Sequence, residues 1–331
     1  MQLTQKKSRR GDLLTAAAVA MLLAVMAALL YTGSLTRQVT NMLIPTAVYI
    51  VMAVSLNLVV GLLGELSLGH AGFMSAGLFS GCLVAIALTN TALPLMVRLP
   101  VSMLAGGLTA AVFGLLVGLP TLRLRGDYLA IVTLACGEII KNIITNLRVT
   151  GGALGLNTTA IYAGAKELLP YGAALVLLTV AVMLNLKRSK YGRAIMAIRD
   201  NRIAAESVGL SVTRYKLAVF VIAAFFAGCA GVLYGHSLAN IKAAAFDYNM
   251  SIEILVIVVL GGMGSVPGSV VSAIVLTVLP EALREVADYR MLVYAVVLIL
   301  VMQATNNPAM KRFFGAACKS LTPKRKERAA L

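Results

Sequence analysis

The stretch that decides the fold is KRSKYGRAIMAIRDNRIAAESVGLSVTRYK, residues 187–216. It carries eight basic residues and two acidic ones, whereas the sequence on either side is almost entirely apolar. A Lys or Arg at the centre of a hydrocarbon layer costs roughly 2.5 to 3.5 kcal/mol on insertion scales, so this stretch has to lie in water. The sequence therefore predicts a polar loop between membrane-spanning segments, on the cytosolic side, where positive charge collects.

The composition of the chain is that of a membrane protein. Of its 331 residues, 60% are hydrophobic and 13% are charged, with a mean hydropathy of +0.89, whereas soluble domains carry about 25% charged residues. The net charge is +16, but 21 of the 29 Lys and Arg residues collect in four places: residues 1–12, Arg123 and Arg125, residues 187–216, and residues 309–331. If all four places are cytosolic, the positive-inside rule explains this charge. We therefore expect a lipid bilayer as the partner and no nucleic acid.

Apolar segments of about 20 residues, the length that a transmembrane helix needs, recur along the chain. Two shorter apolar pieces, 251–262 and 268–280, flank GGMGSVPGS and form either two thin helices or a re-entrant hairpin. We predict an all-α integral membrane protein with about ten transmembrane segments, including short or re-entrant helices interrupted by glycine. The longer segments are 13–32, 42–61, 67–88, 99–119, 128–145, 171–186, 214–238 and 289–307.

With the N-terminus in the cytosol, this order of segments returns every basic cluster to the cytosolic side. The predicted organisation is a cytosolic tail (1–12), a transmembrane domain (13–308) that contains the cytosolic loop 187–216, and a basic cytosolic tail (309–331). The loop at 146–169 then falls on the outer side. There it is either a receiving surface for a soluble partner or a flexible connector.

Glycine interrupts the apolar pattern at two places, GLLGELSLGHAGFMSAG (61–77) and residues 261–268. The first of them also carries the polar residues Glu65, Ser67 and His70. Transporters often build sites near the bilayer midplane from paired, interrupted helices in the two halves of the chain. We therefore expect the two stretches to be counterparts.

Glu138 is the ionisable residue deepest in a predicted span, ten residues past Tyr128 and roughly 15 Å into the segment. A carboxylate at that depth needs a partner or a watery cavity. Two interpretations stay open, a polar lining of a pathway through the membrane and a structural carboxylate bonded to a neighbour such as Lys141. The candidate pathway residues are Glu138, Thr133, Ser67 and His70, and a structural role is the alternative for Thr133 and His70.

Residues 199–210 predict a short amphipathic helix inside the cytosolic loop. Asp200 or Asn201 can cap its start, and Gly209 can end it. An apolar face that has no hydrocarbon to meet suits docking into the groove of a partner protein. That face holds Ile203, Ala204, Ser207 and Val208, and another face holds Arg199, Arg202 and Glu206.

The sequence shows no pattern typical of catalysis or of a cofactor site. It has no GxxxxGK[ST] phosphate loop, and no Ser/His/Asp or paired-carboxylate grouping stands out. Four widely separated cysteines and two histidines give neither a metal-ligand spacing nor a disulfide framework. We therefore expect no enzymatic activity, no cofactor and no metal in this chain.

Six short motifs follow one another between residues 41 and 308. They are GLLGELSLGHAGF (61–73), LRGDYLAIVTLACGEII (124–140), TGGALGL (150–156), YGRAIMAIRDNRIAAESVGLSVTRYKLAVF (191–220), AGCAGVLYG (227–235) and VVLGGMGSVPGSVV (258–271). In this order they resemble the permease subunits of bacterial ABC importers for branched-chain amino acids, in particular the longer of the two paired permeases.

The resemblance implies one half of a channel in the bacterial inner membrane, with both termini in the cytosol. It also implies four kinds of neighbour: a second homologous permease, two cytosolic ABC ATPases that hydrolyse the ATP, an extracytoplasmic solute-binding protein, and the lipid bilayer. The ATPase-docking helix of ABC importers follows an EAA-x-x-x-G pattern, and Ile203 stands here where that pattern begins with Glu. The implied ATPase-coupling residues are Arg199, Arg202, Ile203, Ala204, Ala205, Glu206 and Gly209.

Two alternatives remain. Permeases of the same superfamily carry urea, sugars or nucleosides, so the substrate can be urea or another small polar solute. A stand-alone proton-coupled carrier would use Glu138 and Glu253 as proton sites. The helix at 199–210 favours ATP-driven import, because a self-sufficient carrier needs no such partner surface.

Overall fold

The computed structural model describes residues 2–32, 36–89, 94–124, 126–282, 296 and 299. The chain divides into two compact units, Met1–Val278 and Leu279–Leu331. Nearly all described residues belong to the first unit. The predicted span at 289–307, except for residues 296 and 299, and the predicted tail at 309–331 lie outside the described residues.

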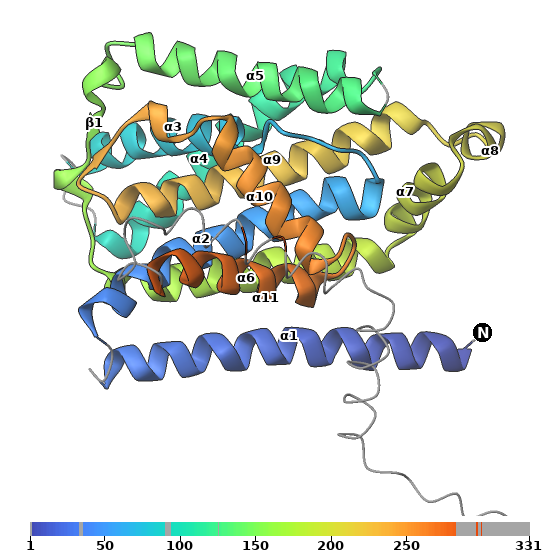
Figure 1. The fold of residues 1–331 in the computed structure, drawn as a ribbon, viewed down its shortest axis with the longest axis horizontal. Helices are drawn as coiled ribbons and strands as arrows, with labels where there is room; N and C mark the ends of the chain where they lie inside the picture. Colours follow the sequence, from blue (N-terminus) through green and yellow to red (C-terminus); the bar gives the residue numbers. More distant parts are fainter. Residues whose placement is uncertain are drawn as a thin grey trace, which may run out of the picture. The chain divides into compact units, whose positions relative to one another are not determined.

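A helix occupies each of the other predicted segments (Figure 1). The long helices are α1 (Gln2–Tyr31), α2 (Arg37–Asn57), α3 (His70–Thr89), α4 (Leu95–Thr121), α5 (Asp127–Asn146), α6 (Ala165–Arg188) and α9 (Val212–His236). The shorter ones are α7 (Lys190–Asp200), α8 (Arg202–Ser207), α10 (Tyr248–Gly261) and α11 (Val266–Ala282), and a π-helical turn, η1 (Leu58–Leu63), extends α2. The all-α class is confirmed.

Seven helices among the described residues are long and apolar enough to cross a membrane. The stretch around GGMGSVPGS forms two helices, α10 and α11, whose 14 and 17 residues correspond to lengths of about 21 and 26 Å. Each of the two alone is shorter than the roughly 30 Å hydrocarbon core, although Ala243–Gly261, which contains α10, counts among the seven. The two interpretations, two thin helices and a re-entrant hairpin, both stay predictions. The total of about ten transmembrane segments stays a prediction.

The helix formed by α2 and η1 is the centre of the first unit. In its most apolar 18-residue window, 94% is buried by the rest of the chain, and α6, α9 and α10 pack around it. Hydropathy alone does not reveal this position, because a helix that is apolar on every face suits both lipid and a protein interior.

Glycines bring α3, α4 and α9 close together. Gly77 of α3 lies against the backbone of Gly228 in α9 and of Gly106 in α4, and a β-carbon on Gly77 would overlap both. Membrane helices associate through such close backbone packing, because lipid provides little hydrophobic force between them. The contact fixes the position of α9, whose first turns carry part of the site described below.

The first unit has a pair of short strands at one end and the short helices α7 and α8 at the other. Figure 1 shows α8 at the opposite end from β1. At one end, β1 (Leu156–Asn157) pairs antiparallel with β2 (Asn240–Ile241), and Thr158 donates a hydrogen bond to the Leu238 carbonyl at 2.6 Å. The segment 146–169 is therefore folded against the residues that follow α9 and is not a free connector. The basic stretch with α7 and α8 forms the other end.

Candidate functional site

The basic stretch 187–216 contains two helices that meet at Asn201. Ser189 caps α7 by accepting from the Gly192 amide at 3.0 Å, and Asn201 caps α8 by accepting from the Ala204 amide at 3.1 Å. Asn201 itself is extended (φ −154°, ψ 103°), because its side chain competes with helical backbone bonding. The predicted single helix over 199–210 is therefore wrong in its extent. The predicted cap at Asn201 is confirmed, and Arg199 belongs to the last turn of α7.

The short helix α8 turns apolar side chains toward solvent. Ile203 is 80% exposed and Val208 75% exposed, and Ala204 is exposed beside them. Gly209 follows in the left-handed conformation (φ 84°). Only Ala205 points inward, where it is buried against Ile198 and Val212. The predicted apolar face thus exists, but Ala205 anchors α8 to the protein and is not part of that face.

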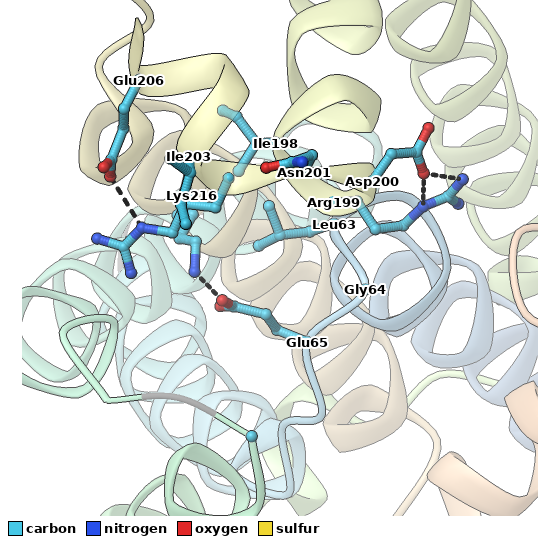
Figure 2. A pocket seen from close by; sticks show the side chains of 12 residues that line it. Leu63, Gly64, Glu65, Ile198, Arg199, Asp200, Asn201, Ile203, Glu206 and Lys216 are labelled. Atoms are coloured by element: carbon cyan, nitrogen blue, oxygen red, sulfur yellow. Dashed lines mark hydrogen bonds and ion pairs between the residues drawn. The ribbon is translucent and has the colours of Figure 1, made fainter.

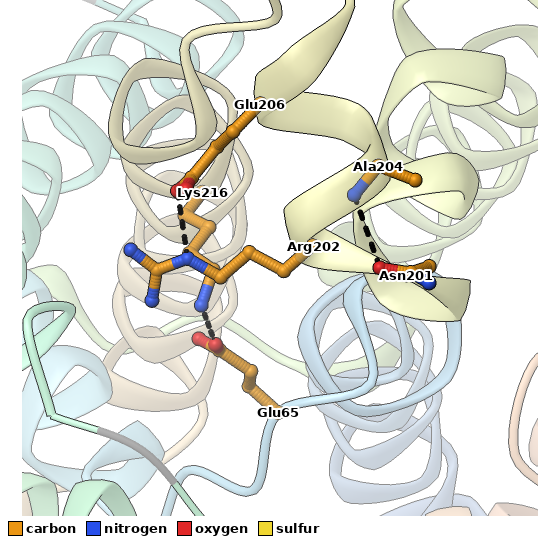
Figure 3. Close-up of polar contacts among 6 residues, drawn as sticks. All are labelled: Glu65, Asn201, Arg202, Ala204, Glu206 and Lys216. Atoms are coloured by element: carbon orange, nitrogen blue, oxygen red, sulfur yellow. Dashed lines mark hydrogen bonds and ion pairs between the residues drawn. The ribbon is translucent and has the colours of Figure 1, made fainter.

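A cavity of about 450 Å³ lies between α8 and the segment that joins η1 to α3. Figure 2 shows its charged side chains in pairs, and Figure 3 shows the pair formed by Glu65 and Lys216 below the pair formed by Arg202 and Glu206. Its lining residues are Leu63, Gly64, Glu65, Gly126, Ile198, Arg199, Asp200, Asn201, Arg202, Ile203, Glu206 and Lys216.

Two of the ion pairs of this cavity, Arg202–Glu206 and Lys216–Glu65, differ in burial. Arg202 and Glu206 lie one helical turn apart at 2.8 Å, and both are well exposed, so their contribution to stability is small. Lys216 of α9 donates to Glu65, and its side chain is only 6% exposed. Removing one partner of such a buried pair costs about 3 to 5 kcal/mol, because a charge is left without compensation. Glu65 thereby ties the segment 64–69 to α9.

The two glycine-interrupted stretches lie in direct contact. Asn57 of α2 accepts from the Gly264 amide at 2.7 Å and donates to Ser269 Oγ at 2.8 Å and to the Ser265 carbonyl at 3.2 Å. A β-carbon on Gly61 would overlap both the Asn57 side chain and the Gly264 backbone nitrogen. The end of α2 and the turn between α10 and α11 are therefore one structural junction, which we call the glycine junction (residues 57–64 and 261–269).

Two cations from the basic stretch 187–216 bind carbonyls of the glycine junction. Arg199 Nη1 lies 3.1 Å from the Gly61 carbonyl oxygen, and Lys187 Nζ lies 3.1 Å from the Gly264 carbonyl oxygen. Asp200 orients the Arg199 guanidinium by accepting from its Nε and Nη2. Hydrogen bonds with a charged donor contribute roughly 1.5 to 3 kcal/mol. Arg199, which the resemblance placed among the ATPase-coupling residues, thus contacts the end of α2.

Three of the predicted pathway residues surround the segment 64–69. Thr133 of α5 accepts from the Leu68 amide at 3.1 Å, and His70 Nε2 lies 2.8 Å from Ser55 Oγ. Ser67 is buried, and its Oγ has no hydrogen-bond partner among the described residues. Of the three, only Thr133 bonds the backbone of this non-helical segment, which needs side chains to satisfy it. His70 instead links the start of α3 to Ser55 of α2.

Glu138 lies on another part of α5 and forms an ion pair with Lys141, three residues along the same helix. The side chains are 26% and 18% exposed, respectively. The predicted neighbour is thereby confirmed, and a carboxylate without a polar partner is excluded. Because both residues belong to α5, this ion pair does not itself bind α5 to another helix.

The family described as the permease component of branched-chain amino acid transport systems matches residues 38–302. The chain belongs to this family. The match covers all helices from α2 to α11 and includes both halves of the glycine junction.

The permease is similar to proteins named high-affinity branched-chain amino acid transport system permease protein LivM. It is 36% identical to the one from Salmonella typhimurium and 37% identical to the one from Escherichia coli, in both cases over 78% of this chain and 66% of the relative. It therefore spans just under two thirds of the length of these relatives. The LivH permease protein of Salmonella typhimurium is 31% identical over 37% of the chain and 40% of LivH. No solved structure matches the permease.

Three elements of the site in this permease were not predicted from the sequence. The roles of Asn57 and Lys187 depend on contacts with residues 207 and 77 positions away, which periodicity does not encode. The pairing of Glu65 with Lys216 had a weak signal, since each is an ionisable residue at the edge of an apolar segment. Charge complementarity between such edges would have suggested the pair.

Proposed function

We propose that the chain is the transmembrane permease subunit of an ATP-binding cassette importer and forms half of the translocation pathway for branched-chain amino acids. Its place is the bacterial inner membrane, with both termini in the cytosol. Family membership supports the permease role, and the seven membrane-length helices support a multi-pass protein. The greater similarity to LivM than to LivH supports the role of the longer permease.

The observation that carries the proposal is the exposure of Ile203 and Val208 on α8. These large apolar side chains lie at the end of the first unit that holds the basic stretch, where no hydrocarbon can cover them. A helix that offers apolar side chains in this way fits a hydrophobic groove of a partner. We assign the groove to a cytosolic ATPase. The residues that would contact the ATPase are then Arg202, Ile203, Ala204, Glu206 and Gly209. Ala205 holds α8 against its own chain, and Arg199 bonds the end of α2.

The complete transporter would contain a second, homologous permease, two cytosolic ATPases and an extracytoplasmic solute-binding protein. ATP hydrolysis belongs to the ATPase subunits. The folded outer segment 146–169, held by β1 and β2, is the surface of this chain that we assign to the solute-binding protein. Its exposed Leu154 and Tyr162 offer contact area there.

The pathway residues follow from the same proposal. Glu138 and Lys141 form a partly exposed ion pair on a membrane helix, and lipid is an unfavourable neighbour for such a pair. We place this face of α5 toward the pathway or the second permease. We also place Thr133, Ser67 and His70, which lie in or next to the segment 64–69, along the pathway.

Reconstitution of the complete complex in proteoliposomes tests this function. We expect ATP-dependent uptake of labelled leucine, and uptake of urea or ribose at background level. Uptake of urea or ribose in preference to leucine would change the substrate in this proposal and leave the proposed ATP-driven mechanism unchanged. Uptake driven by a proton gradient without ATPase subunits would overturn the proposal in favour of a stand-alone carrier.

Co-purification tests the docking surface separately. Ile203→Asp should abolish association with the ATPases while the subunit inserts and folds normally, because this side chain makes little contact with its own chain. Leu154→Asp is the matched control, since Leu154 is 83% exposed at the opposite end. Equal loss of association in both variants would contradict the assignment of α8.

A further inference from the structure

We propose that α7 is a brace with two attachments, and that Arg199 and Lys187 are positioning residues that couple α8 to the glycine junction. The inference rests on the proposed function, because it presumes that an ATPase acts on α8. It goes further by naming how a movement of α8 reaches the transmembrane helices of this chain.

The first step concerns the two carbonyl groups that the brace holds. Gly61 lies in the final π-helical turn of α2, and Gly264 lies in the turn between α10 and α11. Carbonyls at such interruptions lose their helical partners, and within a membrane protein they must be satisfied by other groups. Arg199 and Lys187 supply charged donors to one carbonyl each.

The second step is that both donors belong to one short, well-anchored piece of chain. Lys187 lies in the last turn of α6, and Arg199 lies in the last turn of α7. Ser189 caps α7 between them, and Ile195 and Ile198 bury one side of the helix. A tilt or shift of α7 therefore acts on both donors together, since the helix between them is a stiff element.

The third step links the two carbonyls to one another. Asn57 holds the Gly264 amide and the Ser269 hydroxyl, and Gly61 lies directly against Gly264. The two halves of the glycine junction are consequently held together as one unit. Withdrawing Arg199 and Lys187 removes the external supports of that unit, while Asn57 remains as its internal support.

The fourth step connects the brace to α8. Asn201 is the single extended residue between α7 and α8, so a displaced α8 pulls on the last turn of α7. Asp200 and Arg199 occupy that turn and are bonded to one another. Movement of α8 is thereby passed to the Gly61 carbonyl through Arg199, and to the Gly264 carbonyl through α7 and Lys187.

The test uses the complete complex in proteoliposomes and measures leucine uptake for each ATP hydrolysed. We expect Arg199→Gln and Lys187→Gln to assemble with the ATPases and hydrolyse ATP, while uptake per ATP falls at least ten-fold in the double variant. Arg193→Gln is the matched control on α7, because its guanidinium bonds only the nearby Arg188 carbonyl among the contacts described. This control should keep the uptake per ATP of the original protein.

A second readout reports the glycine junction itself. Ser67 is buried and lies three residues after the first half of the junction ends at Gly64. A Ser67→Cys thiol should therefore react slowly with a permeant thiol reagent in the original background and several-fold faster when combined with Arg199→Gln. The chain without Ser67→Cys gives the background from the native cysteines. Arg199→Lys keeps the charge but loses the planar fork, and it should restore part of the coupling.

The outcomes separate this inference from the proposed function. Loss of ATPase association in all variants, including the control, would indicate failure of the docking assignment. Unchanged uptake per ATP and unchanged thiol reactivity in the double variant would overturn the brace. A fall in uptake that only follows a fall in the amount of assembled complex would also overturn it, because it would assign the two cations a purely structural role.

Discussion

Lys216 donates a hydrogen bond to Glu65 across 151 residues of sequence, in the cavity beneath α8. The pair joins the start of α9 to the non-helical segment 64–69. Because α9 is packed tightly against α3 and α4, it gives that segment a fixed point of attachment.

Breaking this ion pair should destabilise the protein. We expect Lys216→Met to lower the free energy of unfolding by about 3 kcal/mol, because Glu65 would remain buried without its counter-charge. The double variant Lys216→Met with Glu65→Leu should recover much of this loss. Thermal unfolding in detergent measures both. Glu206→Gln on the exposed pair with Arg202 is the control and should change stability by less than about 1 kcal/mol.

Gly61→Ala should destabilise the glycine junction by several kcal/mol, since its β-carbon would overlap the Asn57 side chain and the Gly264 backbone. Gly164→Ala is the control. Gly164 has nothing within 4 Å of its added carbon and an ordinary φ of −71°, so a change below about 1 kcal/mol is expected. Equal unfolding temperatures for the two variants would argue against a close approach of the two interruptions.

Glu138→Gln should reduce leucine uptake at least ten-fold in a complex that still assembles and hydrolyses ATP. Lys141 would keep its charge without the carboxylate in a place where charge is expensive, and the pathway would lose its acidic group. Glu167→Gln, in the first turn of α6, is the control and should transport normally. Full transport by Glu138→Gln would indicate that Glu138 has a structural role. In that case Glu138→Leu should impair assembly of the complex.

Thiol labelling can establish the orientation of the two ends. A Lys190→Cys residue should react with a membrane-impermeant reagent only after the cells are permeabilised, whereas Leu154→Cys should react in intact cells. The reason is that the positive-inside rule places the basic stretch in the cytosol, and β1 and α8 lie at opposite ends. Labelling of Lys190→Cys from outside intact cells would contradict the predicted topology.

The helices were predictable because their signal is local. Hydropathy over about 20 residues located α1 to α6, α9, α10 and α11, and Asn201 with Gly209 marked the limits of α8 by their capping chemistry. The break between α7 and α8 was missed, because one capping residue serves both as an end and as a start. Arg199 and Arg202, three residues apart, looked equivalent in sequence although only Arg202 lies on α8.

The site was less predictable because its decisive contacts join distant parts of the chain. In the sequence Lys187 resembles any other loop lysine. Its partner is the backbone carbonyl of Gly264, and a backbone group gives no sequence signal of such a contact. The partners of Asn57 lie 207 to 212 residues away, so they could be found only from the positions of α10 and α11. Thr133 and His70 were predicted as pathway residues, which stays a prediction. The contacts that the structure shows for them are with the Leu68 amide and with Ser55.

The burial of α2 also has a consequence for biogenesis. Asn57 leaves the ribosome 207 residues before Gly264 does. Until Gly264 is made, the Asn57 side-chain amide, which is buried in the finished fold, has none of the partners that bind it there. A nascent chain that stalls before residue 264 would therefore expose a polar defect in an otherwise apolar helix.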